Sequence, residues 1–113
     1  MNASQALDLW KRVPRVSEIV ECLHFGSHGA RFKVLQAAHR QTVAEIVFKW
    51  AGHVFVAAGG CTRHQSDEWD ANFGKTLAIT RAAEQLREDM SKWAWAQYVY
   101  LERKEATKKA LTP

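Results

Sequence analysis

The stretch TVAEIVFKWAGHVFVAA, residues 42–58, decides the fold predicted for this chain. Its first half alternates, so that one face of an extended segment carries Ala44, Ile46, Phe48 and Trp50. Because successive side chains point to opposite faces of a β-strand, this period of two predicts a half-buried strand over residues 42–50. The short link Ala51-Gly52 leads into a second apolar run at residues 53–58, which predicts an antiparallel hairpin.

The segments before the hairpin supply one more strand and two helices. In residues 31–38, the apolar Phe32 and Val34 alternate with charged residues, and this pattern predicts the first strand of the sheet. Residues 2–10 have apolar side chains at helical spacing, and Pro14 ends that helix. Beyond Pro14, a helical stripe of apolar residues predicts a second short helix, which stops at Gly26.

A polar loop and a long helix follow the hairpin. Residues 59–70 contain glycine, serine and aspartate, which favour turns and helix N-caps, so we expect an exposed loop there. From about Ala71 onward an apolar stripe predicts a long helix, and residues 102–113 predict a frayed polar tail. The predicted fold is α+β in the order α-β-β-β-α, a three-stranded antiparallel sheet covered by helices on one face. We expect a single domain over residues 1–101.

The composition is that of an ordinary globular domain. The chain has 113 residues, 47% of them hydrophobic and 25% charged, which suits one hydrophobic core. The longest apolar run, residues 54–58, is far short of the roughly 20 residues of a membrane-spanning helix, and early charges interrupt any signal peptide. We therefore expect a cytoplasmic protein without a membrane partner. The net charge of +4 mixes both signs, so it permits a nucleic-acid partner without indicating one.

Cysteine and histidine are the residues that most suggest chemistry. Cys22, His24 and His28 in one segment, with Cys61 and His64 in another, carry the ligand atoms that zinc prefers. Their spacing is not that of a standard zinc finger, and cysteines beside regular elements fit buried, reduced thiols better. No third group for nucleophilic catalysis can be identified beside them in the sequence. We therefore expect no metal, no cofactor and no enzymatic activity.

Five tryptophans in 113 residues are many, and aromatic residues gather toward the C-terminal end. Trp93, Trp95 and Tyr98 lie on the predicted long helix. Two helical steps of about 100° each place Trp95 nearly opposite Trp93, so at least one of them lies at the surface or in a second contact. Exposed aromatic side chains are typical of interfaces with proteins or with stacked bases. A second small core that includes Trp10 is the alternative.

The element order and the stretch GGCTRHQSDEWDANFGKTLAITRAAEQL, residues 59–86, resemble the double-stranded-RNA-binding-domain-like fold, over roughly residues 3–90. The resemblance implies that duplex is held by the first helix, by the loop between the first two strands and by the start of the last helix. In this chain the corresponding residues are Gln5, His39, Arg40, Lys75 and Arg81. The shorter stretch WDANFGKTLAITRAAEQL is also similar to a pattern in small uncharacterised bacterial and phage proteins of that fold.

Two hypotheses of different classes follow. The first is a non-catalytic regulatory protein that contacts duplex nucleic acid through phosphate and shape, using the residues that the resemblance marks. The second is a small phage-type inhibitor or adaptor, for example an anti-CRISPR-like protein, that binds a protein partner through the aromatic surface of Trp93, Trp95 and Tyr98. The edges of a three-stranded sheet also leave a homodimer open.

Overall fold

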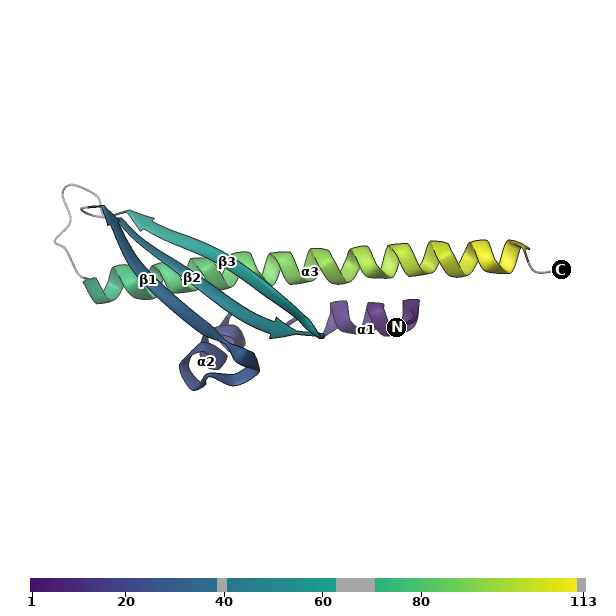
Figure 1. Cartoon of the computed structure of the whole chain (residues 1–113), viewed down its shortest axis with the longest axis horizontal. Helices are drawn as coiled ribbons and strands as arrows, with labels where there is room; N and C mark the ends of the chain where they lie inside the picture. Colours follow the sequence, from purple (N-terminus) through teal and green to yellow (C-terminus); the bar gives the residue numbers. More distant parts are fainter. Residues whose placement is uncertain (39–40, 63–70, 112–113) are drawn as a thin grey trace. The chain divides into compact units, whose positions relative to one another are not determined.

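The computed structural model describes residues 1–38, 41–62 and 71–111. Its elements are drawn in Figure 1: α1 (Ala3–Lys11), α2 (Val16–Phe25), the 3-10 turn η1 (Ser27–Gly29), β1 (Arg31–Ala38), β2 (Gln41–Trp50), β3 (His53–Thr62) and α3 (Ala71–Leu111). This order confirms the predicted α+β fold. The first helical region is split near Pro14 into α1 and α2, because the proline ring cannot continue a helix that has already formed.

Contacts divide the chain into two compact units, which we describe separately. The sheet unit, Pro14–Arg87, contains α2, the three strands and the first part of α3. The helical unit consists of Met1–Val13, which includes α1, and of α3 from Glu88 onward. The boundary expected at residue 101 stays a prediction.

The strands pair in the order β1-β2-β3, each antiparallel to the next. Phe48 lies opposite Phe55 and Ile46 opposite Ala57, so β2 and β3 present these four side chains on the same face. Ala51 and Gly52 connect the two strands with φ values of 52° and 78°. Positive φ at both central residues is typical of the type I′ turn, whose twist matches that of the strands it joins.

The face of the sheet that carries Ile46 and Phe48, here called the inner face, holds the core of the sheet unit. Helix α2 and the first part of α3, up to Arg87, lie on this side of the strands, as Figure 1 shows, which confirms the prediction of helices on one face. Buried side chains come from both layers: Ile19, Leu23, Ala44, Ile46, Phe48, Ala57, Ala78, Ala82, Ala83 and Leu86. The alanines of α3 keep the helix backbone close to the strands, because their side chains occupy little of the space between the layers.

Strand β3 is longer than the sequence predicts. Residues 59–62, expected in an exposed loop, continue β3, with Gly59 opposite Ala44 and Gly60 opposite Val43. The reason is a close approach, since a Cβ atom at Gly59 would lie 2.2 Å from the backbone nitrogen of Ala82 on α3. Gly59 is therefore the point where helix and strand touch and not a turn residue. The rest of the predicted loop, residues 63–70, lies outside the described residues.

Helix α3 has 41 residues and continues through residues 102–111, the stretch expected to fray. Its side chains there are exposed, in agreement with their polarity. Glutamate, lysine, arginine, alanine and leucine dominate this stretch, and these residues have high intrinsic helix propensity. Intrinsic helix propensity therefore supports the helix over residues 102–111, where the sequence has no apolar stripe. None of the described helices combines the length and the apolarity that crossing a membrane requires.

Candidate binding surfaces

In the helical unit, α1 and the second part of α3 run side by side in opposite directions. The backbone N–H of Ala3 donates to Oε1 of Glu105 at 3.1 Å, while seven residues further along α1 the Trp10 ring contacts Trp95. Residue numbers therefore increase along α1 in the direction in which they decrease along α3, so the two helices are antiparallel. Ala3, Ala6 and Ala94 are buried, and side chains of this size allow two helices to approach closely.

Three aromatic side chains gather on this helical pair and are called the aromatic cluster: Trp10, Trp95 and Tyr98. The ring centroids of Trp10 and Trp95 lie 5.1 Å apart, and those of Trp95 and Tyr98 lie 5.3 Å apart, in tilted arrangements. Trp10 nevertheless keeps 39% of its surface exposed and Trp95 keeps 44%. The aromatic rings therefore support one another without forming a closed core.

The hydroxyl of Tyr98 is held by the residue one turn further along α3. A hydrogen bond to the Glu102 carboxylate, together with the charge of that carboxylate, raises the pKa of Tyr98. Tyr98 is thus a neutral donor at physiological pH. Trp93, also predicted for this surface, is half-buried and lies about 200° around the helix from Trp95, so it faces another direction. Two of the three predicted aromatic residues come together, and Trp10 joins them.

Gln5, which the RNA-binding resemblance marks, is exposed on α1 and caps that helix. Its backbone N–H donates to Oδ1 of Asn2, and its Oε1 accepts from the backbone N–H of Asn2, both at 2.8 Å. This reciprocal pair is a capping box, which satisfies two backbone donors at the start of a helix. Gln5 also lines a shallow groove on α1 together with Asp8 and Arg12.

The other basic residues marked by the resemblance lie in the sheet unit. Nζ of Lys75 sits 5.6 Å from the ring centroid of Phe32 on β1, a cation–π contact. Arg81 donates from Nη1 to the carbonyl oxygen of Gly60 on β3 at 2.7 Å. The two cations therefore reach opposite edge strands, because six residues along a helix correspond to a rotation of about 120°. His39 and Arg40 lie outside the described residues.

The cysteines and histidines are dispersed. Cys61 is buried on β3, and Cys22 is half-buried on α2, where burial first and the charges of Glu21 and Glu18 next raise the pKa of its thiol. A raised pKa lowers the fraction of thiolate, the form that binds metals and acts as a nucleophile. Within residues 1–38, 41–62 and 71–111, no group of three His, Cys, Asp or Glu side chains is placed to hold a metal ion. His64 is outside these ranges.

Comparisons with known proteins add little to this geometry. No protein-family model matches the chain, and no curated protein matches it significantly. Among solved structures, the chain is similar to one described as the crystal structure of Rv2632c, at 26% sequence identity and a TM-score of 0.41. The similarity covers 74% of this chain and 92% of that one. At this TM-score it supports no statement about function.

Two features of the surface involve residues that were not predicted from the sequence as binding sites. The first is the contact of Trp10 with Trp95, which the sequence offered only as the alternative of a second small core, because it depends on how α1 folds back along α3. The second is the apolar character of the other sheet face, the outer face, where Val54 and Val56 are exposed. A signal for the outer face exists, because β2 and β3 carry apolar residues at both odd and even positions.

Proposed function

We propose that this chain is a non-catalytic binding protein that recognises a protein partner through the aromatic cluster of Trp10, Trp95 and Tyr98. The observation that carries this proposal is the partial exposure of two contacting tryptophans on one helical pair. Tryptophan and tyrosine are the residues that most often dominate binding energy at protein interfaces, because they bury a large area and still offer a hydrogen-bond donor.

The cluster is also arranged to bind with little loss of conformational freedom. Trp95 is held between Trp10 and Tyr98, and the Tyr98 hydroxyl is held by Glu102. Both helices are tied together at the far end by the hydrogen bond from Ala3 to Glu105. Side chains that are already ordered before binding lower the entropic cost of forming an interface. An adaptor or inhibitor that works by occupying a partner's surface needs such a preordered binding surface and no catalytic group.

Photo-crosslinking followed by an affinity measurement tests the proposal. A photoreactive phenylalanine analogue replaces Trp95 in the full-length protein, expressed in cells that produce it natively, and the crosslinked partner is identified by mass spectrometry. The same analogue at Phe25, an aromatic side chain exposed on α2, is the matched control. We expect a protein to crosslink from position 95 and not from position 25.

The purified partner then allows a quantitative comparison. We expect Trp95→Ala to weaken its binding at least about 30-fold, as truncation of an interface hot spot does, and Phe25→Ala to change binding less than about threefold. Both variants change exposed side chains, so circular dichroism should show an unchanged helical content. Equal affinity of wild type and Trp95→Ala would show that the aromatic cluster is not the interface.

Duplex nucleic acid is the second candidate partner, and one observation favours it. Lys75 lies over Phe32 of β1, and the exposed Arg31 and Lys33 flank Phe32 on the same strand. Arg31 and Lys33 lie on the outer face of β1 and Lys75 lies on its inner side, so this edge of the sheet carries cations on both faces. Cations at such an edge are suited to phosphate groups, whose binding releases counterions and weakens steeply with salt. A titration of labelled duplex RNA and DNA between low and moderate salt, with Lys75→Glu as the variant, tests this candidate. Binding that is insensitive to salt and to Lys75→Glu would count against it.

A further inference from the structure

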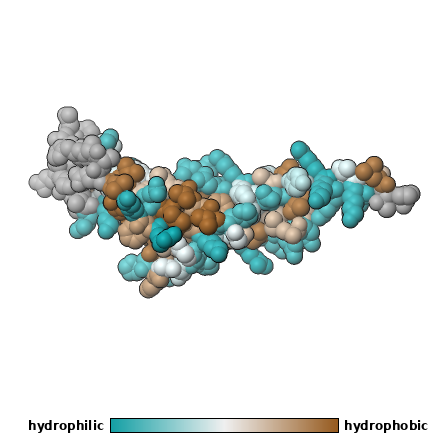
Figure 2. Space-filling view, in the orientation of Figure 1, coloured by the Kyte–Doolittle hydropathy of each residue, from teal (hydrophilic) through white to brown (hydrophobic). Residues whose placement is uncertain are grey.

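The outer face of the sheet, opposite the side that packs against the first part of α3, is apolar over residues 54–58 of β3 and carries Val43 and Val47 on β2. The register places Val47 opposite Val56. Every second residue along each strand, counted from this pair, therefore lies on the same face. Val54 and Val56 are 64% and 55% exposed, and Leu35 on β1 is 49% exposed. The apolar side chains of this face are Leu35, Val43, Val47, Val54, Val56 and Ala58. Figure 2, which views the strands from this side, shows a hydrophobic patch over the sheet with hydrophilic residues around it.

The outer face carries more apolar side chains than is usual for a sheet face in contact with water. The water-facing side of an antiparallel sheet normally carries polar side chains in alternation with the apolar residues of the core. On the outer face of β2, Val43 and Val47 alternate with Glu45 and Lys49, while the outer-face positions 54, 56 and 58 of β3 are Val, Val and Ala. Large contiguous apolar surfaces that stay exposed on a folded domain are typical of places where another molecule binds.

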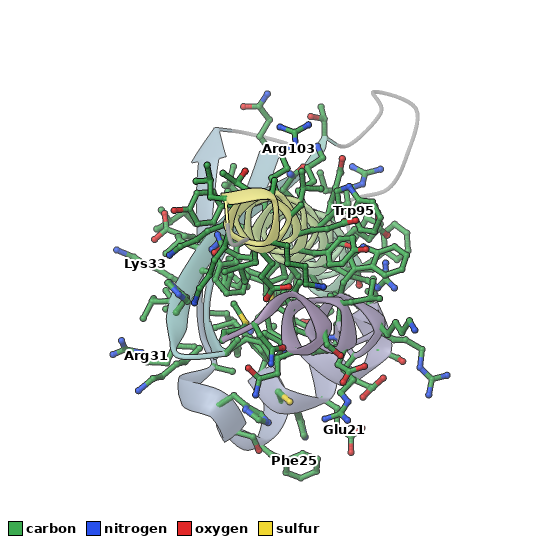
Figure 3. The ribbon with its side chains drawn as sticks, turned by 90° about the vertical axis from the view of Figure 1, so that its right-hand side faces the viewer. Glu21, Phe25, Arg31, Lys33, Trp95 and Arg103 are labelled. Atoms are coloured by element: carbon green, nitrogen blue, oxygen red, sulfur yellow. The ribbon has the colours of Figure 1, made fainter. Side chains whose placement is uncertain are left out.

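Charged residues border the patch on one side. Arg31 and Lys33 project from β1 away from the ribbon, as Figure 3 shows, and Lys49 of β2 shares their face by register. Glu45, opposite Lys33, is the acidic residue on this face among the residues described. The face therefore combines the apolar side chains of β3 and of Val43 and Val47 on β2 with an excess of positive charge from Arg31, Lys33 and Lys49.

We propose that the outer face binds an amphipathic helix of a protein partner, with an apolar stripe flanked by acidic residues. A helix with side chains is about 10 Å wide, close to the width of two strands spaced about 4.8 Å apart. Laid over β2 and β3, it covers the valines, and its acidic flank meets Arg31 and Lys33 on the neighbouring strand. A second copy of this chain fits less well, because two identical faces with the same excess charge repel.

The proposal does not depend on the aromatic cluster, since it concerns a different unit of the chain. The test uses synthetic peptides of about 15 residues, roughly four helical turns, each with a leucine stripe. One peptide has glutamate flanks, a second has lysine flanks, and a third has the composition of the first in scrambled order. Each is titrated into the full-length protein labelled with ¹⁵N, and amide shifts report where it binds.

We expect the glutamate-flanked peptide to shift amides of β2 and β3 and to bind at least tenfold more tightly than either of the other two peptides. The double variant V54T/V56T replaces one methyl group of each side chain by a hydroxyl and nearly keeps its shape, and it should weaken binding about tenfold. Lys33→Glu should weaken binding several-fold at low salt, an effect that salt reduces. Lys104→Glu, which changes an exposed lysine on α3, is the charge-matched control and should leave binding unchanged.

Several results would overturn the proposal. Equal binding of the lysine-flanked peptide would remove the role of charge, and shifts confined to α1 or α3 would move the site elsewhere. If the wild-type protein self-associates and V54T/V56T does not, the molecule that binds the outer face is a second copy of this chain. Binding of duplex nucleic acid that Lys33→Glu abolishes and V54T/V56T does not alter, with no peptide binding, would make phosphate the ligand. If V54T/V56T fails to fold, Lys33→Glu against Lys104→Glu still decides the matter.

Discussion

On the inner face of β2, Ile46 and Phe48 are fully buried, whereas on the outer face of the same strand Val43 and Val47 keep part of their surface in water. The two sets of side chains alternate along one strand and have similar hydrophobicity. What separates them is coverage, because α2 and the first part of α3 lie over one face only. Burial in this sheet is thus decided by the second layer and not by the strand. The following changes test that difference, from the largest expected effect to the smallest.

Truncation of one apolar residue on each face should have the most unequal effects. Phe48→Ala leaves a cavity under α3, and we expect it to lower the free energy of unfolding by about 4 kcal/mol. Val56→Ala removes a side chain that is 55% exposed, and we expect a loss of less than about 1 kcal/mol. Urea denaturation followed by circular dichroism measures both. Equal losses would mean that the outer face is buried in the protein in solution.

The adjacent glycines of β3 provide a second matched pair. A Cβ at Gly59 meets the backbone of α3 at 2.2 Å, whereas the nearest atom for a Cβ at Gly60 is 3.7 Å away. We expect Gly59→Ala to lower the free energy of unfolding by about 3 kcal/mol, because helix and strand must separate. Gly60→Ala should change it by less than about 0.5 kcal/mol. The same urea titration checks both, and a tolerated Gly59→Ala would show that α3 does not contact β3 there.

The turn that joins the two strands should respond to backbone conformation alone. Ala51 has a positive φ of 52°, which asparagine tolerates better than alanine, and Asn-Gly is the preferred pair for a type I′ turn. We expect Ala51→Asn to raise the melting temperature, with a gain of about 0.5–1 kcal/mol. Gly52→Ala, at a φ of 78°, should do the opposite by about 1 kcal/mol. Scanning calorimetry distinguishes the two signs.

Charge on the outer face should have the smallest effect on stability. Glu45 lies directly opposite Lys33, and Glu45→Lys places like charges there. Because both side chains are exposed, we expect a loss of about 0.5 kcal/mol at low salt that decreases at high salt. Unfolding experiments at two salt concentrations measure it. A loss that persists at high salt would contradict the electrostatic origin.

The fold was predictable from local patterns, and the candidate surfaces only in part. The alternation around Ile46 and Phe48 predicts β2, and Pro14 and Gly26 predict the ends of the helical regions. The stretch 59–62 misleads, because two adjacent glycines are typical of turns and the signal that makes Gly59 a strand residue comes from α3. Trp95 was predictable as a surface or second-contact residue, but its contact with Trp10 spans 85 positions of the chain.

Sequence by itself determined the order of helices and strands, since hydrophobic period, proline, glycine and helix propensity act within a few residues. Tertiary structure alone decided which face of the sheet is covered, where α3 touches β3, and which aromatic rings meet. These depend on contacts between segments far apart in the chain, and neither apolar alternation nor composition records them. The exposure of the outer-face valines and the pairing of the tryptophans in the helical unit are both consequences of such long-range contacts.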